Sequence, residues 1–444
     1  MPTHAYTLIL SIIFVMCIFS ACDNSTDANG HNDKLSSITN SSSSRDYPDS
    51  FKPNDTEYPY AGIPRIVIET EYRKKIKDRE TEIPAKMQIW GKASAESEIM
   101  DLTIRGRGNT SWTDFHKKSY KIEFEKKQSM LRMPKDKDWA LIANHADKSL
   151  MRNYIAYRLS AMLDSYYTPR CEFAELYING EYLGVYLLSE TVKIAKSRVD
   201  IPKDDYSYIV EFDAKYKEDE QVIFSNILLE NDSVKPFRIH DPKNATAMSL
   251  DTLQSHIQAF EKFLKTIEPT AKNKVDKWIN IDESIKHYWV QEFSKNADAP
   301  FFTSVYFTWV KGEKIKMGPV WDFDLAFGNH KQDSINTTQN WYIRKYWYMY
   351  LLKDNEYNAK NDEFWKSKRK VFANTLNTID SCQKLLDQAA QNNFKRWDIL
   401  GKTDNNWIRK TFDSYKDAVE DLKSWMFQRM EWIDSQQNKV TDDK

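Results

Sequence analysis

Alternating apolar and polar residues dominate the first half of the chain. This period of two is typical of β-strands with one buried face. It recurs in five short runs, at residues 65–70, 86–90, 100–106, 119–124 and 138–143. Residues 171–190 have the clearest hairpin pattern, because Asn179-Gly180 suits a type I′ turn between two such runs. The first half is therefore predicted to be rich in β-structure.

Helical spacing, with apolar residues three and four positions apart, appears once in this region and dominates after about residue 250. In the first half it covers residues 147–163, where Asp147 can cap the helix. Four longer helical patterns follow, at residues 253–267, 282–296, 363–394 and 411–437. Short strands are predicted at residues 206–213 and 221–230, and a hairpin-like pair at residues 302–326. The pattern predicts an α+β chain with a β-rich lobe at residues 61–213 and a mainly helical lobe at residues 214–444.

The first 60 residues differ from the rest. A hydrophobic run from about Tyr6 to Phe19 is short for a membrane span and ends in Ser20-Ala21-Cys22. Small residues before a cysteine resemble a bacterial lipobox, which predicts a lipoprotein signal peptide at residues 1–21 and a lipid on Cys22. An ordinary secretory signal with an incidental cysteine is the alternative.

The polar stretch at residues 22–60 has too few large apolar side chains to fold and is expected to be a flexible tether. The lipid on Cys22 would then be the only contact with a membrane. These features predict a secreted protein of the bacterial cell envelope, anchored outside the cytoplasm at the periplasmic or the cell surface.

Composition narrows the classes of partner. The chain has 64 Lys and Arg against 65 Asp and Glu, a net charge of −1. No overall field favours nucleic acid, and none is expected as a partner. Cys171 and Cys382 could pair in an oxidising compartment or remain two buried thiols. No Cys/His spacing suggests a zinc site.

Two of only 11 glycines lie in a basic loop, Arg105-Gly106-Arg107-Gly108-Asn109. Interleaved glycines and arginines let backbone N–H groups and guanidiniums face one anion, as in phosphate-binding loops. Lys118 starts the next predicted strand and could add a positive charge. An exposed basic β-turn is the alternative interpretation.

Asp322 and Asp324 lie one residue apart within MGPVWDFDLAFGN, residues 317–329. If this stretch is extended, both carboxylates point to one face while Trp321 and Phe323 pack on the other. Two carboxylates so close repel each other unless a cation lies between them. Mg²⁺ fits, because it prefers oxygen ligands, and an arginine is the alternative.

Asn296 and Asp298 form another polar pair, at a predicted helix-to-strand junction. Alone, this N-x-D suits a simple turn. Together with the basic loop and the aspartate pair it supplies the parts that phosphoryl transfer requires. These are donors for the phosphates, a cation to neutralise them and a carboxylate to orient the attacking hydroxyl.

The sequence resembles the spore-coat-protein-H (CotH) kinase family. The resemblance rests on four stretches between about Ile104 and Asn329, which are RGRGNTSW…KKSYKIEF, DKDWALIANHADKSLMRNYIAYRL, ELYINGEYLGVYLLSETVKI and GPVWDFDLAFGN. It implies an atypical protein-kinase-like bilobal fold that binds ATP with Mg²⁺ (or Mn²⁺). It also implies transfer of the γ-phosphoryl group to Ser or Thr of a protein substrate.

The resemblance also assigns roles to residues. Asp298 would be the catalytic aspartate and Asp322 the metal-binding one, with Asn296 and Asp324 as further metal or orienting ligands. Lys118 matches the family's K-x-Y and would reach the ATP phosphates. The remaining nucleotide contacts would come from Arg105 or Arg107 and, near the adenine, Glu190. The chain departs from ordinary protein kinases in having no H-R-D and no Glu in the predicted helix at residues 147–163.

Two other functions fit the sequence. A catalytically inactive surface scaffold could use the aromatic run at residues 341–350 as a ligand platform, unless that run is core. An ATP-dependent nucleotidyl transferase could use the same Mg²⁺–ATP site. Glycoside hydrolysis also needs two carboxylates but leaves Arg105, Arg107 and Lys118 unexplained.

Overall fold

The computed structural model describes residues 51–228, 234–403, 406–408 and 410–442. The predicted signal peptide, Cys22 and residues 22–50 of the tether lie outside the described residues. The described residues belong to one compact unit. Within the described residues, each helix is too short or too polar to cross a bilayer.

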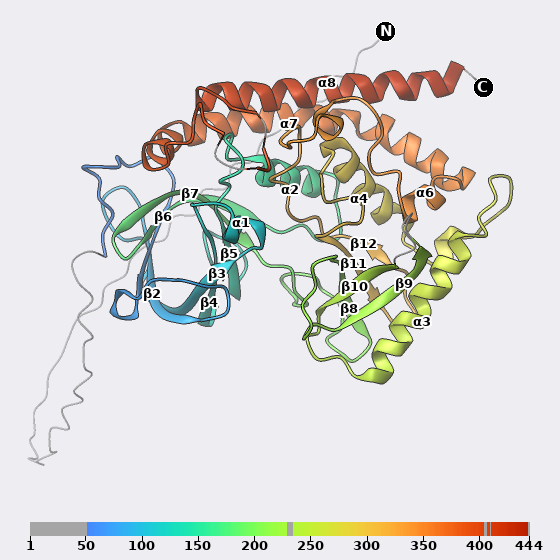
Figure 1. The fold of residues 1–444 in the computed structure, drawn as a ribbon, viewed down its shortest axis with the longest axis horizontal. Helices are drawn as coiled ribbons and strands as arrows, with labels where there is room; N and C mark the ends of the chain where they lie inside the picture. Colours follow the sequence, from blue (N-terminus) through green and yellow to red (C-terminus); the bar gives the residue numbers. More distant parts are fainter. Residues whose placement is uncertain (1–50, 229–233, 404–405, 409, 443–444) are drawn as a thin grey trace, which may run out of the picture. The chain divides into compact units, whose positions relative to one another are not determined.

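A closed barrel follows the N-terminal segment, with strands in the order β1-β2-β3-β4-β5-β7-β6 (Figure 1). Its strands are β1 (Arg65–Thr70), β2 (Ile83–Trp90), β3 (Met100–Arg107), β4 (Ser119–Gln128), β5 (Asp136–Ile142), β6 (Cys171–Ile178) and β7 (Glu181–Glu190). β1 pairs parallel with β6 and the other neighbours pair antiparallel. The predicted turn of the β6–β7 hairpin is confirmed, because Asn179 and Gly180 both have positive φ, at 54° and 79°.

A second sheet has the order β12-β11-β8-β10-β9. Its strands are β8 (Ser207–Phe212), β9 (Val222–Leu228), β10 (Val234–Asp241), β11 (Val305–Val310) and β12 (Lys316–Met317). β8 pairs antiparallel with both β10 and β11. The expected lobe boundary after residue 213 therefore passes between strands of one sheet. β10 was not predicted, because only Phe237 and Ile239 of this strand are buried and the alternation is weak.

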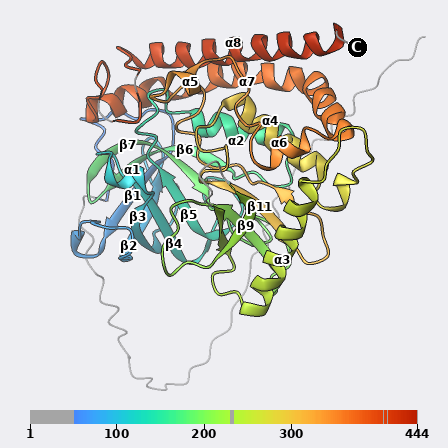
Figure 2. The same ribbon diagram turned by 45° about the vertical axis from the view of Figure 1, so that its right-hand side comes forward.

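Five long helices form most of the remaining structure in the described part of the chain. They are α2 (Arg152–Met162), α3 (Ala247–Leu264), α4 (Ile281–Ser294), α7 (Asn355–Arg396) and α8 (Tyr415–Asp442). Short helical turns connect them, namely η1 (Glu71–Arg73), α1 (Thr110–Thr113), η2 (Val275–Lys277), α5 (Asp333–Asn336) and α6 (Trp347–Leu351). α7 packs against α8 and also contacts β7 and α2 (Figures 1 and 2). The α+β class is confirmed, whereas the kinase-like bilobal arrangement stays a prediction.

Side-chain caps explain where several helices begin. Thr246, Asn280 and Asp354 each accept a backbone N–H from the first turn of α3, α4 and α7. α2 begins five residues later than predicted. Asp147 does not start the helix; its Oδ2 accepts the backbone N–H of Arg152 at 2.8 Å and its Oδ1 forms a buried ion pair with the Arg152 guanidinium.

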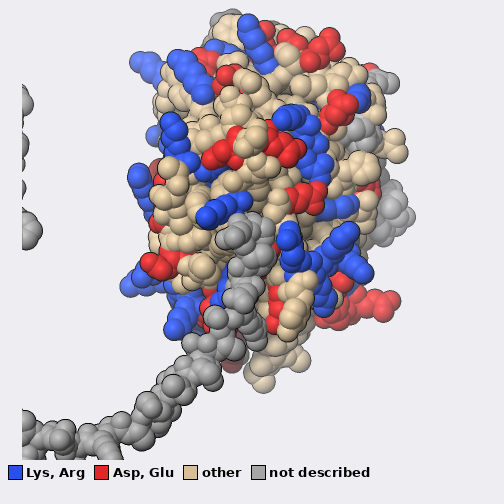
Figure 3. Space-filling view, turned by 90° about the vertical axis from the view of Figure 1, so that its left-hand side faces the viewer, with Lys and Arg blue, Asp and Glu red and all other residues tan. Residues whose placement is uncertain are grey.

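The hydrophobic core answers two questions that the sequence left open. The aromatic run at residues 341–350 is core, because Ile343, Tyr346, Trp347 and Tyr348 are buried. It is therefore not an exposed ligand platform. Cys171 and Cys382 are buried free thiols. The surface drawn in Figure 3 carries basic and acidic side chains interspersed with one another, as the balanced composition predicts.

Candidate functional site

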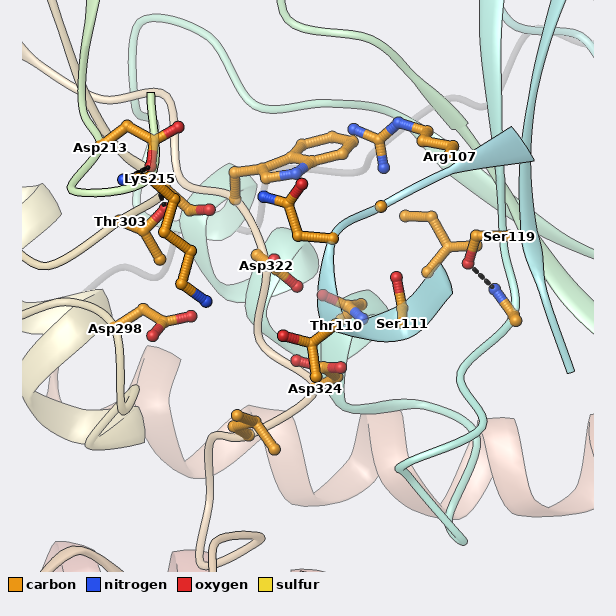
Figure 4. A pocket seen from close by; sticks show the side chains of 18 of the residues that line it. Arg107, Thr110, Ser111, Ser119, Asp213, Lys215, Asp298, Thr303, Asp322 and Asp324 are labelled. Carbon is orange, nitrogen blue, oxygen red and sulfur yellow. Dashed lines mark hydrogen bonds between the residues drawn. The ribbon is translucent and has the colours of Figure 1, made fainter. Parts of the chain in front are cut away.

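A cavity of about 520 Å³ is lined by residues of the barrel, of the second sheet and of the segments around residues 298 and 322 (Figure 4). It brings together five of the predicted site residues, which are Arg105, Arg107, Asp298, Asp322 and Asp324. These residues are far apart in the sequence, and the fold places basic and acidic groups around one space. The cavity is therefore the candidate site.

The glycine loop needs its glycines for separate reasons. A Cβ on Gly106 would lie 2.5 Å from the Trp112 ring, so no larger residue fits there. Gly108 has φ 98°, which L side chains rarely adopt. The Arg79 guanidinium donates to the Gly108 carbonyl at 2.7 Å and holds the loop at the end of β3. Ser111, in the short helix that follows, also lines the cavity.

The two loop arginines are used differently. Arg105 is drawn toward Glu82, with 3.4 Å between Nε and Oε1, and it also donates to the Arg79 carbonyl. The Arg107 guanidinium lies over the Trp321 ring, 4.8 Å from its centroid. The charge of Arg107 also opposes the rise that burial causes in the pKa of Asp322. Arg107 is thus the loop arginine that acts on the acidic side of the cavity.

The segment that carries the aspartate pair is not a strand, so the extended geometry expected for it is wrong. β12 ends at Met317, and Asp322 has φ 63°. Trp321 lines the cavity beside Asp322 and does not point to an opposite face. The backbone of the segment is held by side chains, because the Phe323 N–H donates to Asn153 Oδ1 at 2.7 Å. Both carboxyls reach the cavity through this irregular backbone.

The three aspartates are partly buried, and the charge of Asp322 raises the pKa of both Asp298 and Asp324. Burial, with the charge of Asp322 as the next cause, raises the pKa of Asp298 to about 7. Burial also raises the pKa of Asp324, helped by the charges of Asp322 and Asp298. Among the ion pairs of the described residues, none includes these three carboxyls, although the charge of Arg107 lowers the pKa of Asp322 from a greater distance. A bound cation would relieve this repulsion.

The side chains of the cavity could supply only some of the ligands that a metal ion needs. Across the described part of the chain, no three His, Cys, Asp or Glu side chains converge as a complete metal centre. Mg²⁺ typically takes one or two carboxylates and completes its shell with water and phosphate oxygens. Asp322 and Asp324 match that requirement, since they face the cavity and lack a cationic partner at ion-pair distance.

Asn296 lies outside the cavity lining and contacts the backbone at both Asp298 and Asp322. Its side chain is buried, its Nδ2 donates to the Asp322 carbonyl at 3.0 Å, and its Oδ1 accepts the Asp298 backbone N–H at 3.3 Å. The amide therefore ties the two aspartate segments together. It is placed to orient them and is not among the residues that line the cavity.

Lys117, and not the predicted Lys118, lines the cavity. The Lys118 ammonium donates to the Trp112 carbonyl, and Lys118 does not line the cavity. Lys117 does; it is buried, and its Nζ lies 2.9 Å from Asn393 Oδ1. Burial holds the pKa of Lys117 well below its usual value. Adjacent residues near the start of a strand point to opposite faces. Of the two neighbouring lysines, only one can therefore face the cavity, and the strand register decides which.

Glu190 serves a structural ion-pair network. Its buried carboxylate accepts from Arg170 Nε at 2.8 Å, from Arg198 Nη1 at 2.6 Å and from the Tyr167 hydroxyl at 3.1 Å. It is not among the residues that line the cavity. The adenine contact expected for it therefore gains no support from the geometry.

The second sheet contributes residues that were not predicted. Arg238 of β10 pairs with Glu211 and Asp213 at the end of β8, and Lys215 follows in the next loop. The only sequence signal was the polar run after a predicted strand, EFDAKYK, which also suits an ordinary surface loop. Their contribution depends on strand pairing, which brings residues 211–215 beside Asp298.

Comparison with known proteins identifies the family of the chain. The inner spore coat protein H of Bacillus subtilis (strain 168) is 28% identical over 265 residues, which cover 58% of this chain and 66% of that relative. The match thus spans slightly less than two thirds of the relative's length. A family model described as CotH kinase protein matches residues 104–433, which is well over half of the chain. The chain therefore belongs to the CotH kinase protein family.

Proposed function

We propose that the chain transfers the γ-phosphoryl group of ATP to Ser or Thr hydroxyls of a protein, with Mg²⁺ or Mn²⁺. The observation that carries the proposal is one cavity in which the basic side chains Arg107 and Lys215 lie around three aspartates. Basic groups and loop N–H groups would bind the phosphates, and Asp322 and Asp324 would hold the cation. The bound cation would supply neutralisation of phosphate charge.

Asp298 is the residue best placed to orient the acceptor hydroxyl. Its pKa of about 7 suits a group that accepts a proton near neutral pH. Asn296 holds its backbone against the Asp322 segment, so the two carboxyls keep a defined separation. Arg107, stacked on Trp321, would be preorganised toward the phosphates.

Labelled nucleotides test this proposal. The purified full-length protein is incubated with γ-labelled or, separately, α-labelled ATP, with Mg²⁺ or Mn²⁺, and with dephosphorylated casein as a test acceptor. Transfer of the γ label to protein is the expected result. Transfer of the α label would instead indicate nucleotidyl transfer. Nucleotide binding without transfer of either label would indicate a scaffold role.

We also propose that the protein is held in the bacterial cell envelope by a lipid on Cys22. The support is the apolar run that ends in Ser20-Ala21-Cys22, followed by a polar stretch. Metabolic labelling with palmitate should mark the wild-type protein and not Cys22→Ser. Equal labelling of both proteins would contradict the anchor.

A further inference from the structure

The cations that line the cavity differ in how far they are already engaged. They are Arg79, Arg105, Arg107, Lys117, Lys215, Lys217 and Arg238. Five of them have polar partners in the protein. Arg79 and Lys117 donate to backbone carbonyls, and three form ion pairs with Glu82, Glu80 and the acids of β8. Arg107 and Lys215 are left for a ligand.

Lys215 has no polar partner for its ammonium among the described residues. Its Nζ lies 5.8 Å from the centroid of the Phe302 ring, and within the described residues the ammonium forms no hydrogen bond or ion pair. In Figure 4 the side chain extends toward Asp298. Its positive charge also lowers the pKa of Asp298 and of Asp322, against the larger effect of burial. Lys215 is thus a cation available for a phosphate.

The base of the Lys215 loop is held in place. Asp213 Oδ1 accepts the Lys215 backbone N–H at 2.9 Å and the Thr303 hydroxyl at 3.2 Å. Thr303 belongs to the segment that follows Asp298, so this contact ties the loop to the catalytic segment. The backbone of Lys215 is thereby tied to the segment that carries Asp298.

The two available cations lie on opposite sides of Asp322. Figure 4 shows Lys215 and Asp298 on one side and Arg107 on the other. A triphosphate with its inner phosphates near Arg107 would direct its terminal phosphoryl group toward Asp298, where the acceptor hydroxyl is expected. The phosphoryl group would then move within reach of Lys215.

We propose that Lys215 is a catalytic residue that contacts the terminal phosphoryl group of the bound triphosphate and neutralises it during transfer. This assignment rests on the proposed function. In the step, the acceptor oxygen forms a bond to the γ-phosphorus and the bond to the β–γ bridging oxygen breaks. The hydroxyl proton goes to Asp298, and ADP leaves with the electron pair of the broken bond. Lys215 gives up no proton and balances the charge on the phosphoryl oxygens.

The contact between Lys215 and the terminal phosphate can be tested by comparing the affinities of the protein for a diphosphate and for a triphosphate nucleotide. Affinities for Mg²⁺–ADP and for a non-hydrolysable Mg²⁺–ATP analogue are measured by calorimetry on full-length wild type, Lys215→Met and Lys217→Met. Lys217 is the matched control, because it lies in the same loop, lines the same cavity and is already paired with Glu80. Both lysines are exposed, so the melting temperature should stay near that of wild type.

Lys215→Met should weaken binding of the triphosphate analogue about tenfold, while ADP affinity stays within about twofold. It should also lower kcat for γ-label transfer about 100-fold, as expected for loss of one group that stabilises charge in the transition state. Lys217→Met should leave both affinities and kcat within about twofold of wild type. Lys215→Arg should restore part of the preference for the triphosphate.

Three results would overturn the assignment. These are equal weakening of both nucleotides in Lys215→Met, no weakening of either, and the same loss in Lys217→Met. Equal weakening of both nucleotides would place Lys215 at the inner phosphates. The same loss in Lys217→Met would mean that the effect comes only from the net charge of the loop. If wild type binds neither nucleotide or transfers only the α label, the proposed function itself fails and the assignment falls with it.

Discussion

Three aspartates in one cavity are suited to different tasks because their surroundings differ. Asp298 has a pKa of about 7 and a backbone N–H held by Asn296. Asp322 and Asp324 are hydrogen-bonded to each other, which lowers the pKa of Asp322 and raises that of Asp324 while burial raises both. A single acid would suit proton transfer, and the coupled pair suits a divalent cation.

Substitution at these positions should separate chemistry from binding. Asp298→Asn should lower kcat by about 100-fold or more, because the proton acceptor is lost, while the affinity for Mg²⁺–nucleotide stays within about threefold. Asp322→Asn should abolish transfer and also weaken Mg²⁺–nucleotide binding, because a metal ligand is lost. Kinetics of γ-label transfer and calorimetry check both results. Asp251→Asn, at an exposed position of α3, is the control, and wild-type activity in both site variants would refute the roles.

Gly328 lies at the end of the segment that carries Asp322 and Asp324, next to the Trp425 ring of α8. An added Cβ would lie 2.5 Å from Cδ1 of Trp425, and φ is 75°. Gly312 has a similar φ of 86° but open space around it. Gly328→Ala should therefore lower the free energy of unfolding by about 1–3 kcal/mol more than Gly312→Ala, since both are strained and only the first is overpacked.

Urea unfolding of the two variants measures this difference. Gly328→Ala should also lower γ-label transfer, because Trp425 supports the backbone that carries Asp324. Equal destabilisation of both variants would mean that the indole moves aside at no cost.

At the scale of elements, α8 supports the site without lining the cavity. Arg429 of α8 is buried and donates to Glu292 Oε1 of α4 at 2.7 Å. It also donates to the carbonyls of Thr338 and Asn340, at 2.8 Å and 3.0 Å. α4 ends at Ser294, two residues before Asn296, so this contact connects the C-terminal helix to the segment that carries Asp298.

Two cations of α8 should differ sharply in their effect on stability. Arg429→Met leaves the Glu292 carboxylate buried without its charge partner and should lower the free energy of unfolding by about 3–5 kcal/mol. Lys423→Met breaks an exposed ion pair with Asp380 and should cost less than about 1 kcal/mol, because water screens that pair. Denaturant titration compares the two. A loss in Lys423→Met as large as in Arg429→Met would exclude burial as the cause.

For the whole folded unit, one buried histidine makes stability depend on pH. His287 is enclosed in α4, with Nδ1 2.9 Å from the Tyr348 hydroxyl, and burial lowers its pKa to about 3. In the unfolded chain its pKa is about 6.5. Between these values the unfolded chain binds a proton that the folded protein does not. Stability is therefore lost as pH falls below about 6.5, by about 1.4 kcal/mol per pH unit.

His287→Gln should flatten this dependence. The free energy of unfolding of wild type should fall between pH 7 and pH 5 by about 2 kcal/mol more than that of His287→Gln. Urea titrations at the two pH values give the comparison. The exposed His116→Gln should keep the wild-type dependence. The same slope in all three proteins would exclude His287 as the titrating group.

Local patterns in the sequence were sufficient for most elements. Period-two alternation identified the barrel strands, Asn179-Gly180 the hairpin turn, and helical spacing α3, α4, α7 and α8, because each pattern is set by neighbours within a few residues. The residue types of the candidate site could also be predicted from the sequence. Aspartates among apolar residues are unusual, and a glycine–arginine loop is conspicuous in a chain with only 11 glycines.

Only the tertiary structure decided which of these residues face one space. It closed the strands into a barrel, placed Lys117 in the cavity instead of Lys118, and committed Glu190 to two arginines. It also added Lys215 through the pairing of β8 with β10 and β11. The reason is physical, because the direction of a side chain depends on strand register and its charge partner on long-range packing, and neither is encoded within a short stretch of sequence.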